Sequence, residues 1–436
     1  MAGARFVSEL SRRHFMAWAL GAGAAVALGG CVESSTRREP KGSTVTLTFW
    51  NGFTGGDGEY IKKLVEDFNK ATPGIQVKMN IYVWADFFQK VPGAVISGQA
   101  PDVCVMHVDD IPTNAARSIL VPIDDLAQEL GLKASDYTSQ EVWQGGLYQG
   151  RRYGIPFDMH PLGMFYNKAV LRRAGLDPEK PPRTGDEYMA ALEQLKGKGI
   201  PGHWMSPFPF TGTFQFETLL WQFGGELFDP EVTRATFDSD AGVRALTWMV
   251  DLVKKGYSPA NVGQDADVIA LQNGENAFNW NGIWQINALD EVPQLEWGVA
   301  PIPRIGTQDA VWGNSHQFVL LRQRSPSKER LAAARTFIQW MSQRSVEWLA
   351  SGKIPVLKSV AESPEFKAMK AQVQFARQAP YIRFPPAVAG IADALAMVDK
   401  AVNQAVLGKA SPADALKSAA AQATQVVRDN HEKYGD

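Results

Sequence analysis

Cysteine is almost missing from this sequence, with only 2 copies in 436 residues. Two thiols exclude a disulfide scaffold and a zinc site made of four thiolates. An excess of one charge is missing too, because 44 Lys and Arg residues stand against 46 Asp and Glu residues. The resulting net charge of −2 argues against a nucleic-acid-binding protein, which needs a basic surface. An apolar content of 45% excludes disorder of the whole chain.

Motifs of catalysis and metal binding are also missing. The sequence has no His-Glu-x-x-His or Gly-x-Ser-x-Gly segment, and no glycine loop that ends in Gly-Lys-Ser/Thr. Its 6 histidines do not show metal-ligand spacing along the chain. Adjacent carboxylates such as Asp109 and Asp110 do not face each other across a substrate, as the acid pair of a glycosidase must. We therefore expect no catalytic residue, no cofactor and no metal.

The first thirty residues have the pattern of an export signal. Arg12 and Arg13 precede an apolar run, residues 17–28, which is shorter than the roughly 20 residues needed to span a bilayer. The run leads into Leu28-Gly29-Gly30-Cys31, which resembles a bacterial lipobox, while Ser-Arg-Arg-x-Phe resembles a twin-arginine signal. The resemblance implies removal of residues 1–30 and a lipid on Cys31. The alternative is an ordinary cleaved signal in which this cysteine has no role.

Residues 31–43 are polar and lack periodicity, which predicts a flexible tether between the lipid and the folded protein. The protein would then be held at the outer face of the membrane. The second cysteine, Cys104, lies in the apolar run of residues 103–106. We expect it to be an inert residue of a buried strand.

From residue 44 onward, apolar patterns alternate between strand and helix periods. Residues 45–50, 75–82 and 103–106 predict strands, and helices are predicted from residue 57 or 58 and over residues 87–96. This order predicts an α/β fold with a mostly parallel sheet covered by helices. Ligands of such sheets lie beyond the carboxyl ends of the strands. The loops at residues 51–57 and 107–110 are therefore the first candidate lining of a site.

Further helices are predicted along the rest of the chain. Thr184 and Ser411 have the sequence context of helix N-caps. Apolar periodicity predicts the other helices over residues 216–223, 243–253, 331–349, 366–376, 391–406 and 413–428. No internal repeat and no second apolar stretch long enough to span a membrane is visible.

Several short motifs occur in a characteristic order. They include Gly98-Gln99-Ala100-Pro101-Asp102, Phe165-Tyr166-Asn167-Lys168, Trp221-Gln222-Phe223-Gly224-Gly225, Asn281-Gly282-Ile283-Trp284 and Gly352-Lys353-Ile354-Pro355. Together they resemble the extracellular solute-binding proteins, family 1, of carbohydrate importers driven by ATP-binding cassettes, the maltose-binding-protein-like group. The similarity covers essentially all of residues 44–430.

The resemblance implies two α/β lobes, each built on a mostly parallel sheet, that close on a solute by hinge motion. Lobe 1 is expected to comprise residues 44–158 and 317–365, and lobe 2 residues 159–316 and 366–436. The crossovers would fall near residues 158–162 and 316–320. The implied partners are a small carbohydrate and the permease subunits of an importer, and the protein is expected to be a monomer with no catalytic activity.

Sugar binding needs aromatic rings that stack on C–H faces and polar groups that pair with hydroxyls. Both kinds of residue concentrate in residues 49–57, 107–110, 208–216, 279–284 and 312–316. By resemblance, Trp284 is the stacking tryptophan after the Asn-Gly turn, and Asp109 and Asp110 bind hydroxyls. The remaining candidates come from the same stretches, the first crossover and a later segment: Trp50, Asn51, Phe53, Thr54, Asp57, His107, Asp158, His160, Phe214, Asn281, Trp312, Asn314, Arg383 and Phe384.

Each candidate has a purely structural alternative. Any of the tryptophans and Phe214 can belong to the core, and Asp57 and Asp109 can cap the helices that follow them. A neutral oligosaccharide is the favoured solute, because the candidate loops carry Asp, Asn and His. A glycerol phosphate derivative is the alternative within the same fold, and a lipid-anchored carbohydrate-active enzyme is the alternative from a different class.

Overall fold

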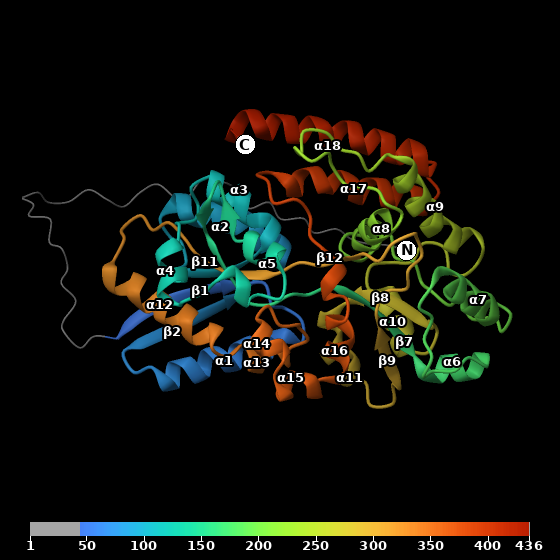
Figure 1. Ribbon diagram of the computed structural model, residues 1–436, viewed down its shortest axis with the longest axis horizontal. Coiled ribbons are helices and arrows are strands. Elements are labelled where there is room, and N and C mark those ends of the chain that lie inside the picture. Colours follow the sequence, from blue (N-terminus) through green and yellow to red (C-terminus); the bar gives the residue numbers. More distant parts are fainter. Residues whose placement is uncertain (1–43, 436) are drawn as a thin grey trace, which may run out of the picture. The chain divides into compact units, whose positions relative to one another are not determined.

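The computed structural model describes residues 44–435. Its first sheet has the strand order β2-β1-β3-β11-β6, in which β1 (Val45–Asn51) lies between β2 and the central strand β3. β1 pairs in parallel with β2 (Ile75–Ile81) and β3 (Val103–His107). β11 (His316–Leu320) runs antiparallel to both β3 and β6 (Gly154–Pro156). The three strands predicted at the start of the chain are thus confirmed (Figure 1). Arg12, Arg13, Cys31 and the predicted tether lie outside the described residues.

β3 shows why this sheet is covered on both faces. Val103 and Val105 pack with α1 (Asp57–Ala71) and α12 (Lys328–Ser342) in one core cluster. Cys104 and Met106 alternate with them and pack with α2 (Trp84–Ser97) and α3 (Ile111–Ala116) in another. A strand that is covered by helices on both faces buries every side chain, so its sequence is a continuous apolar run. Cys104 is fully buried, as expected, and burial raises the pKa of its thiol.

The second sheet has the order β8-β7-β9 and is antiparallel throughout. β7 (Leu162–Asn167) lies between β8 (Phe278–Gly282) and β9 (Trp297–Ala300) and runs opposite to both. The α/β fold class is confirmed, but the prediction of a mostly parallel sheet is wrong for this part. The physical reason is that the strands join through long excursions, and apolar periodicity carries no information about strand direction.

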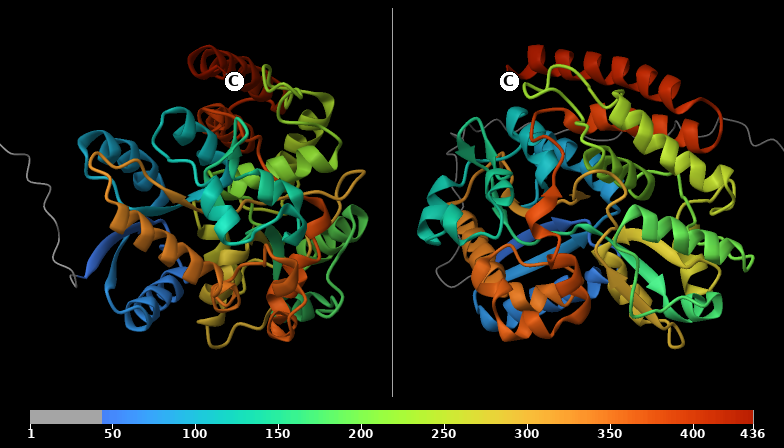
Figure 2. Two further views of the ribbon diagram at one scale, coloured as in Figure 1. Left: turned by 60° about the vertical axis from the view of Figure 1, so that its left-hand side comes forward. Right: turned by 45° about the vertical axis from the view of Figure 1, so that its right-hand side comes forward.

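The two faces of β7 also pack against different helices. Leu162, Met164 and Tyr166 share a core with α7 (Gly185–Lys196), α8 (Thr211–Gln222), α9 (Asp240–Lys254), α17 (Ile391–Val406) and α18 (Pro412–Tyr434). Phe165 faces α10 (Ala266–Gln272), α11 (Ile286–Asp290) and α16 (Lys370–Ala376). Figure 2 shows α18 running alongside α17 at the end of the chain.

Local sequence signals explain where helices begin. Thr184 accepts a hydrogen bond from the backbone N–H of Glu187, and Ser411 accepts one from Asp414, so both predicted caps are confirmed. The helix predicted over residues 331–349 is divided into α12 and α13 (Ser345–Leu349), and that over residues 366–376 into α15 (Pro364–Ala368) and α16.

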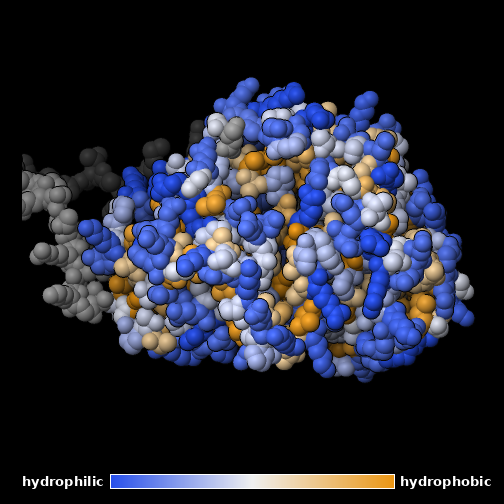
Figure 3. Space-filling model, viewed as in Figure 1, coloured by the Kyte–Doolittle hydropathy of each residue, from blue (hydrophilic) through white to orange (hydrophobic). Residues whose placement is uncertain are grey.

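The remaining elements are short. They are η1 (Val108–Asp110), α4 (Asp124–Glu129), η2 (Ala134–Asp136), α5 (Gln140–Gln144), β4 (Leu147–Tyr148), β5 (Arg151–Arg152), α6 (Lys168–Ala174), η3 (Ile283–Gln285), β10 (Val311–Trp312), α14 (Lys358–Ala361), η4 (Ala379–Tyr381) and β12 (Ile382–Arg383). Hydrophilic side chains dominate the face seen in Figure 3, with small hydrophobic patches between them. Among residues 44–435, no helix combines the length and the apolar character that crossing a membrane requires.

Candidate functional site

Three strand ends of the first sheet bring polar residues to one edge. β1 and β3 are parallel, so their carboxyl ends, at Asn51 and His107, lie at the same edge. β11 is antiparallel to β3, and its first residue, His316, lies directly opposite His107. His160, in the segment that leads from β6 to β7, joins them because its backbone N–H donates to the carbonyl of Asn314 at 2.9 Å.

A buried carboxylate organises these histidines. Asp158 is completely buried and accepts hydrogen bonds from Nδ1 of His316 at 2.8 Å, Nδ1 of His160 at 3.2 Å and Nε1 of Trp348 at 2.6 Å. Burial by itself raises the pKa of the Asp158 carboxyl, but His316 and the hydrogen bonds outweigh burial and hold that pKa well below its usual range.

His107 and His160 are easier to keep neutral than charged. Burial, followed by the nearness of His316, lowers the pKa of His160 to about 3. Burial and the other two imidazoles likewise lower the pKa of His107 well below its usual range. At neutral pH, His107 and His160 therefore present one hydrogen-bond donor and one acceptor each.

Aromatic rings stand beside this polar group. Phe214 of α8 stacks on Trp312 of β10 with centroids 3.5 Å apart and planes 9° apart. Trp284 of η3 lies edge-on to Trp312 at 6.5 Å, and its ring is 6.1 Å from that of His160. The structure therefore brings together the three aromatic candidates that come from residues 208–316, namely Phe214, Trp284 and Trp312. Trp284 and Phe214 remain partly exposed, whereas Trp312 is 3% exposed.

Trp84 at the start of α2 is a residue of this site that the sequence analysis missed. Its ring stacks on His316 with planes 14° apart and lies 4.3 Å from the ring of His107. Gly52 makes this possible, because any Cβ at that position would collide with the indole of Trp84. β2 is parallel to β1, so the carboxyl-end rule applied to β2 also points to Trp84.

Carboxyl groups gather on another side of the site. Asp109 accepts a hydrogen bond from Nδ2 of Asn314 at 2.8 Å. Glu217 of α8 is 1% exposed, and burial, then Asp399 and Asp109, raises its pKa well above the usual range. Glu217 and Asp399 were missed as well. A glutamate inside the apolar, aromatic helix predicted near residue 216 is the signal that could have found the first of them.

The predicted residues of the loop after β1 have structural partners. Asp57 pairs with the buried Lys353 at 3.0 Å and makes no capping hydrogen bond to α1. Oδ1 of Asn51 accepts from the backbone N–H of Phe53, while its Nδ2 is buried without a partner among the described residues. Phe53 is 1% exposed between Trp84, His316 and Trp348, and Thr54 is exposed.

The remaining candidates of the strands and of the segment before α3 have contacts of different kinds. Trp50 packs edge-on against Tyr82 and joins the core on the α2 side of the sheet. The side-chain oxygen of Asn281 accepts from the backbone N–H of Gly282. Asp109 and Asp110 precede α3 without capping it through their side chains, and Oδ2 of Asp110 lies 3.8 Å from Nδ1 of His107.

Arg383 and Phe384 line a pocket of about 600 Å³ together with residues of η1, α5 and the segment before β10. Val108 in its wall directly follows His107 in sequence, but none of the histidines of the site lines this pocket. Arg383 forms two hydrogen bonds with Glu226, at 3.0 and 2.8 Å, and its guanidinium lies over the ring of Trp221. Its charge is therefore already compensated.

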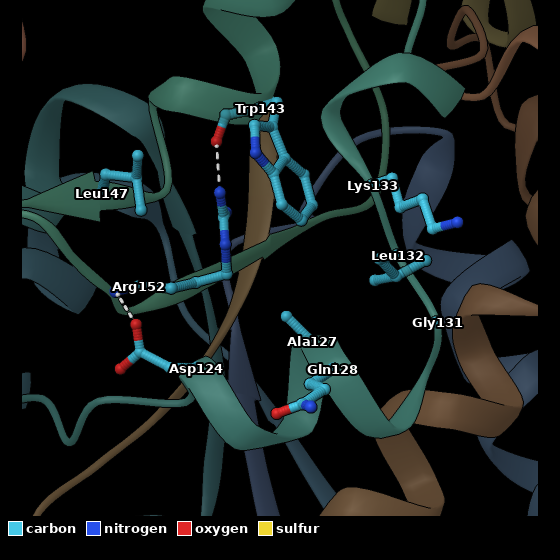
Figure 4. Close-up of a pocket in the computed structure, with 9 residues that line it drawn as sticks. All are labelled: Asp124, Ala127, Gln128, Gly131, Leu132, Lys133, Trp143, Leu147 and Arg152. Carbon is cyan, nitrogen blue, oxygen red and sulfur yellow. Dashed lines mark hydrogen bonds between the residues drawn. The ribbon is translucent and has the colours of Figure 1, made fainter.

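A second pocket of about 450 Å³ lies wholly within residues 124–152 (Figure 4). Arg152 crosses it, with its guanidinium 3.5 Å from the ring centre of Trp143 and a hydrogen bond to the Trp143 carbonyl at 2.9 Å. Burial lowers the pKa of Arg152 to about 10. None of the predicted site residues lines this pocket, so it is separate from the candidate site.

Two helix-covered sheets with a polar and aromatic site along the crossing chain define a two-lobed α/β binding-protein fold. Residues 54–348 match the family described as bacterial extracellular solute-binding protein, and the chain belongs to that family. Residues 9–29 match the signal sequence of the twin-arginine translocation pathway. The protein is thus an exported solute-binding protein that works outside the cytoplasm.

Curated relatives and solved structures agree with this family. The sn-glycerol-3-phosphate-binding periplasmic protein of Escherichia coli (strain K12) is 22% identical, over 95% of this chain and 97% of its own. The maltotriose-binding protein of Pyrococcus abyssi is 23% identical, over 74% of this chain and 68% of its own. The GacH receptor of Streptomyces glaucescens, solved unliganded and with acarbose, superposes with a TM-score of 0.80 at 23% identity, over 88% and 99% of the two chains.

Proposed function

We propose that this protein captures a neutral sugar or oligosaccharide between two lobes and delivers it to the permease of an importer driven by ATP-binding cassettes. The observation that carries the proposal is the group formed by Trp284, the Trp312–Phe214 stack and the polar residues beside them. Aromatic faces suit the C–H surface of a sugar ring, and the carboxyls and neutral imidazoles suit its hydroxyls. The Pyrococcus relative carries a maltotriose-binding name, which agrees with this class of solute.

We propose that lobe 1 comprises residues 44–158 and 317–365 and lobe 2 residues 159–316 and 366–436. β11 supports this division, because it belongs to the first sheet although it follows the second sheet in sequence. Gly56 of the proposed lobe 1 lies against Asn287 of α11, in the proposed lobe 2. A Cβ added to Gly56 would come within 2.7 Å of the Asn287 side chain. Closure of such lobes around a solute is the hinge motion that the permease would recognise.

A glycerol phosphate derivative is the second candidate solute, favoured by the Escherichia coli relative that covers nearly the whole chain. A phosphate needs free cationic or N–H donors. The two cationic residues described at this site already have carboxylate partners: Lys353 is paired with Asp57, and Arg383 with Glu226. Carboxyls such as Asp109 and Glu217 also offer a phosphate no cationic group. The neutral sugar is therefore the better match.

The anchoring of the protein is a further part of the proposal. Cys31 directly follows an apolar signal run, which supports a lipid at this residue and attachment to the outer face of the membrane. We propose that the anchored protein acts as a monomer and is not an enzyme. The names of the relatives support the non-enzymatic role, because two of them are binding proteins and the third is a receptor.

The test is identification of the solute that copurifies with the protein. Mass spectrometry of the ligand released by mild denaturation is expected to yield a hexose or an oligosaccharide, and calorimetry with that sugar is expected to show one site per chain. A released phosphate ester, or binding of glycerol phosphates in place of sugars, would replace the favoured solute by the second candidate. Recovery of the added oligosaccharide in cleaved form would contradict the non-enzymatic role.

A further inference from the structure

Three histidines far apart in sequence meet at the edge of the first sheet. His107 ends β3, His316 begins β11, and the two are directly opposed in the sheet ladder. His160 is held beside them by backbone hydrogen bonds of the crossing segment, including one from Met159 to Ile354. The spacing of the histidines along the chain shows no metal motif, and only the fold brings them together.

The three imidazole rings lie close enough to contact one another. The ring centroids of His160 and His316 are 4.1 Å apart, those of His107 and His316 5.1 Å, and those of His107 and His160 5.4 Å. One nitrogen of each ring lies within 4.8 Å of one nitrogen of the other two. Zn–N bonds of about 2.0–2.1 Å place tetrahedral ligand atoms about 3.4 Å apart, so the rings would have to rotate until their nitrogens come that close to bind one ion.

Asp158 prepares two of these rings for metal binding. It accepts from Nδ1 of both His316 and His160, which leaves their Nε2 atoms without a hydrogen-bond partner in the described part of the chain. A metal-binding histidine commonly donates its other N–H to a carboxylate in this way, which fixes the tautomer and the ring orientation. The Trp348 indole adds a third donor to Asp158 and holds the carboxylate in place.

An oxygen ligand is also at hand. His107, Asp109 and Asp110 form a second group whose potential ligand atoms lie within 4.8 Å of one another. His107 thus belongs to both groups, and either carboxylate can approach an ion bound to the histidines. Lys353, the cation whose charge also acts on His107 and His160, is already neutralised by Asp57.

We propose that His107, His160 and His316 form a binding site for a divalent transition metal of the zinc class, oriented by Asp158. Imidazole ligands favour zinc, nickel, copper and cobalt over magnesium or calcium, which take oxygen ligands. With three protein nitrogens, the site keeps a fourth position for an Asp109 or Asp110 oxygen, for water or for a hydroxyl of the solute. This site is independent of the identity of the solute.

The test uses the full mature protein, purified without a polyhistidine tag, treated with a chelator and titrated with ZnCl₂ in the absence of sugar. One Zn²⁺ per chain with a Kd of about 1 µM or lower is expected in calorimetry and native mass spectrometry. Co²⁺ in place of Zn²⁺ is expected to give the visible absorption of a low-symmetry site. Binding of Zn²⁺ only at about 100 µM or weaker, or by more than one ion without saturation, would overturn the proposal.

Variants locate the ion. His316→Gln and His107→Ala are expected to weaken Zn²⁺ binding at least about 100-fold, and Asp158→Asn about 10- to 100-fold. His431→Gln, on α18, is the matched control and is expected to bind as the parent does. Thermal melting identifies any variant that fails to fold. If a variant does not fold, the Co²⁺ spectrum of the parent protein decides whether nitrogen ligands are present. Undiminished binding in folded His316→Gln and His107→Ala variants would refute the site.

The same preparations separate this inference from the proposed sugar binding. Calorimetry with the copurified sugar is repeated in the presence of the chelator. If the protein binds the sugar but does not bind Zn²⁺, only the proposal of a metal site is wrong. If it binds Zn²⁺ but no sugar, only the proposed solute is wrong.

Discussion

Nζ of Lys353 lies 3.0 Å from Oδ2 of Asp57, and both side chains are buried, with 1% and 9% of their side-chain surface exposed. The two residues are 296 positions apart in sequence. Asp57 is the first residue of α1 and ends the loop that follows β1, while Lys353 follows α13. This ion pair therefore fastens a loop of the candidate site to a distant part of the chain.

Substitution of Lys353 alone is expected to lower the free energy of unfolding. Lys353→Met leaves the Asp57 carboxylate buried and unpaired, and loss of one partner of a buried ion pair typically costs about 3–5 kcal/mol. We expect the free energy of unfolding, measured by urea denaturation, to fall by roughly 3 kcal/mol. The double variant Asp57→Leu with Lys353→Met is expected to recover most of that loss. A single variant as stable as the parent would show that the pair does not hold the loop.

Trp284 is expected to contribute most to solute binding among the tryptophans. It is partly exposed, edge-on to Trp312 and next to His160, so its face is accessible to a ligand. Trp284→Ala is expected to weaken binding of the copurified sugar by at least about 2 kcal/mol, or roughly 30-fold in Kd. Isothermal titration calorimetry measures this change.

The control for this substitution is Trp340→Ala. Trp340 lies on α12, where it contacts Phe68 and Arg344 on the α1 side of the first sheet. Its loss is expected to lower stability without changing sugar affinity. Parent-like affinity of the Trp284→Ala protein would exclude this residue from the site.

Much of the first sheet could be predicted, because the apolar patterns of its strands and helices are visible within short stretches of sequence. Strands such as β3, buried on both faces, need an uninterrupted apolar run, and α1 needs apolar residues at spacings of three and four. The direction of the strands in the second sheet could not be predicted. β7 and β8 pair through residues more than a hundred positions apart, and nothing in the apolar pattern of either strand distinguishes parallel from antiparallel pairing.

The site was predictable only where a sequence rule applies. The carboxyl-end rule found His107 and Asn51, and the same rule applied to β2 would have found Trp84. Lys353 joins the site by packing of distant segments, which no spacing encodes, whereas Glu217 could have been found only from its place inside an apolar, aromatic helix. The partners of Phe53 likewise come from three separate parts of the chain, so only the fold shows that this ring is enclosed.

Cys31 is expected to determine where the exported protein is found. A lipid on this cysteine would hold the protein in the membrane fraction, because each buried methylene of the chain contributes about 0.8 kcal/mol. Cys31→Ala is expected to move the protein to the soluble extracytoplasmic fraction, measured by immunoblotting after fractionation. Cys104→Ala is the control, since that thiol is buried in β3. Unchanged fractionation of the Cys31→Ala protein would refute the anchor.

Asp267 of α10 is expected to make stability depend on pH. Its side chain is completely buried, one oxygen accepts from Nδ2 of Asn279 at 2.6 Å, and the other lacks a partner among the described residues. Burial, which outweighs the hydrogen bond from Asn279, raises the pKa of Asp267 to about 6. An unfolded aspartate has a pKa of about 3.9. Between these values the folded protein binds more protons than the unfolded chain, so its stability falls as the pH rises from about 4 to about 6.

Asp267→Asn should remove this loss, because an amide stays neutral and its oxygen can still accept from Asn279. We expect the variant to exceed the parent by about 3 kcal/mol in free energy of unfolding at pH 8 and to match it near pH 4. Urea denaturation at a series of pH values gives both curves. Asp265→Asn, an exposed neighbour at the start of the same helix, is expected to keep most of the parent's pH dependence, because the charge of Asp265 is only a minor cause of the raised pKa of Asp267. A constant difference between the Asp267→Asn and parent curves would mean that the pKa of Asp267 is the same in the folded protein and in the unfolded chain.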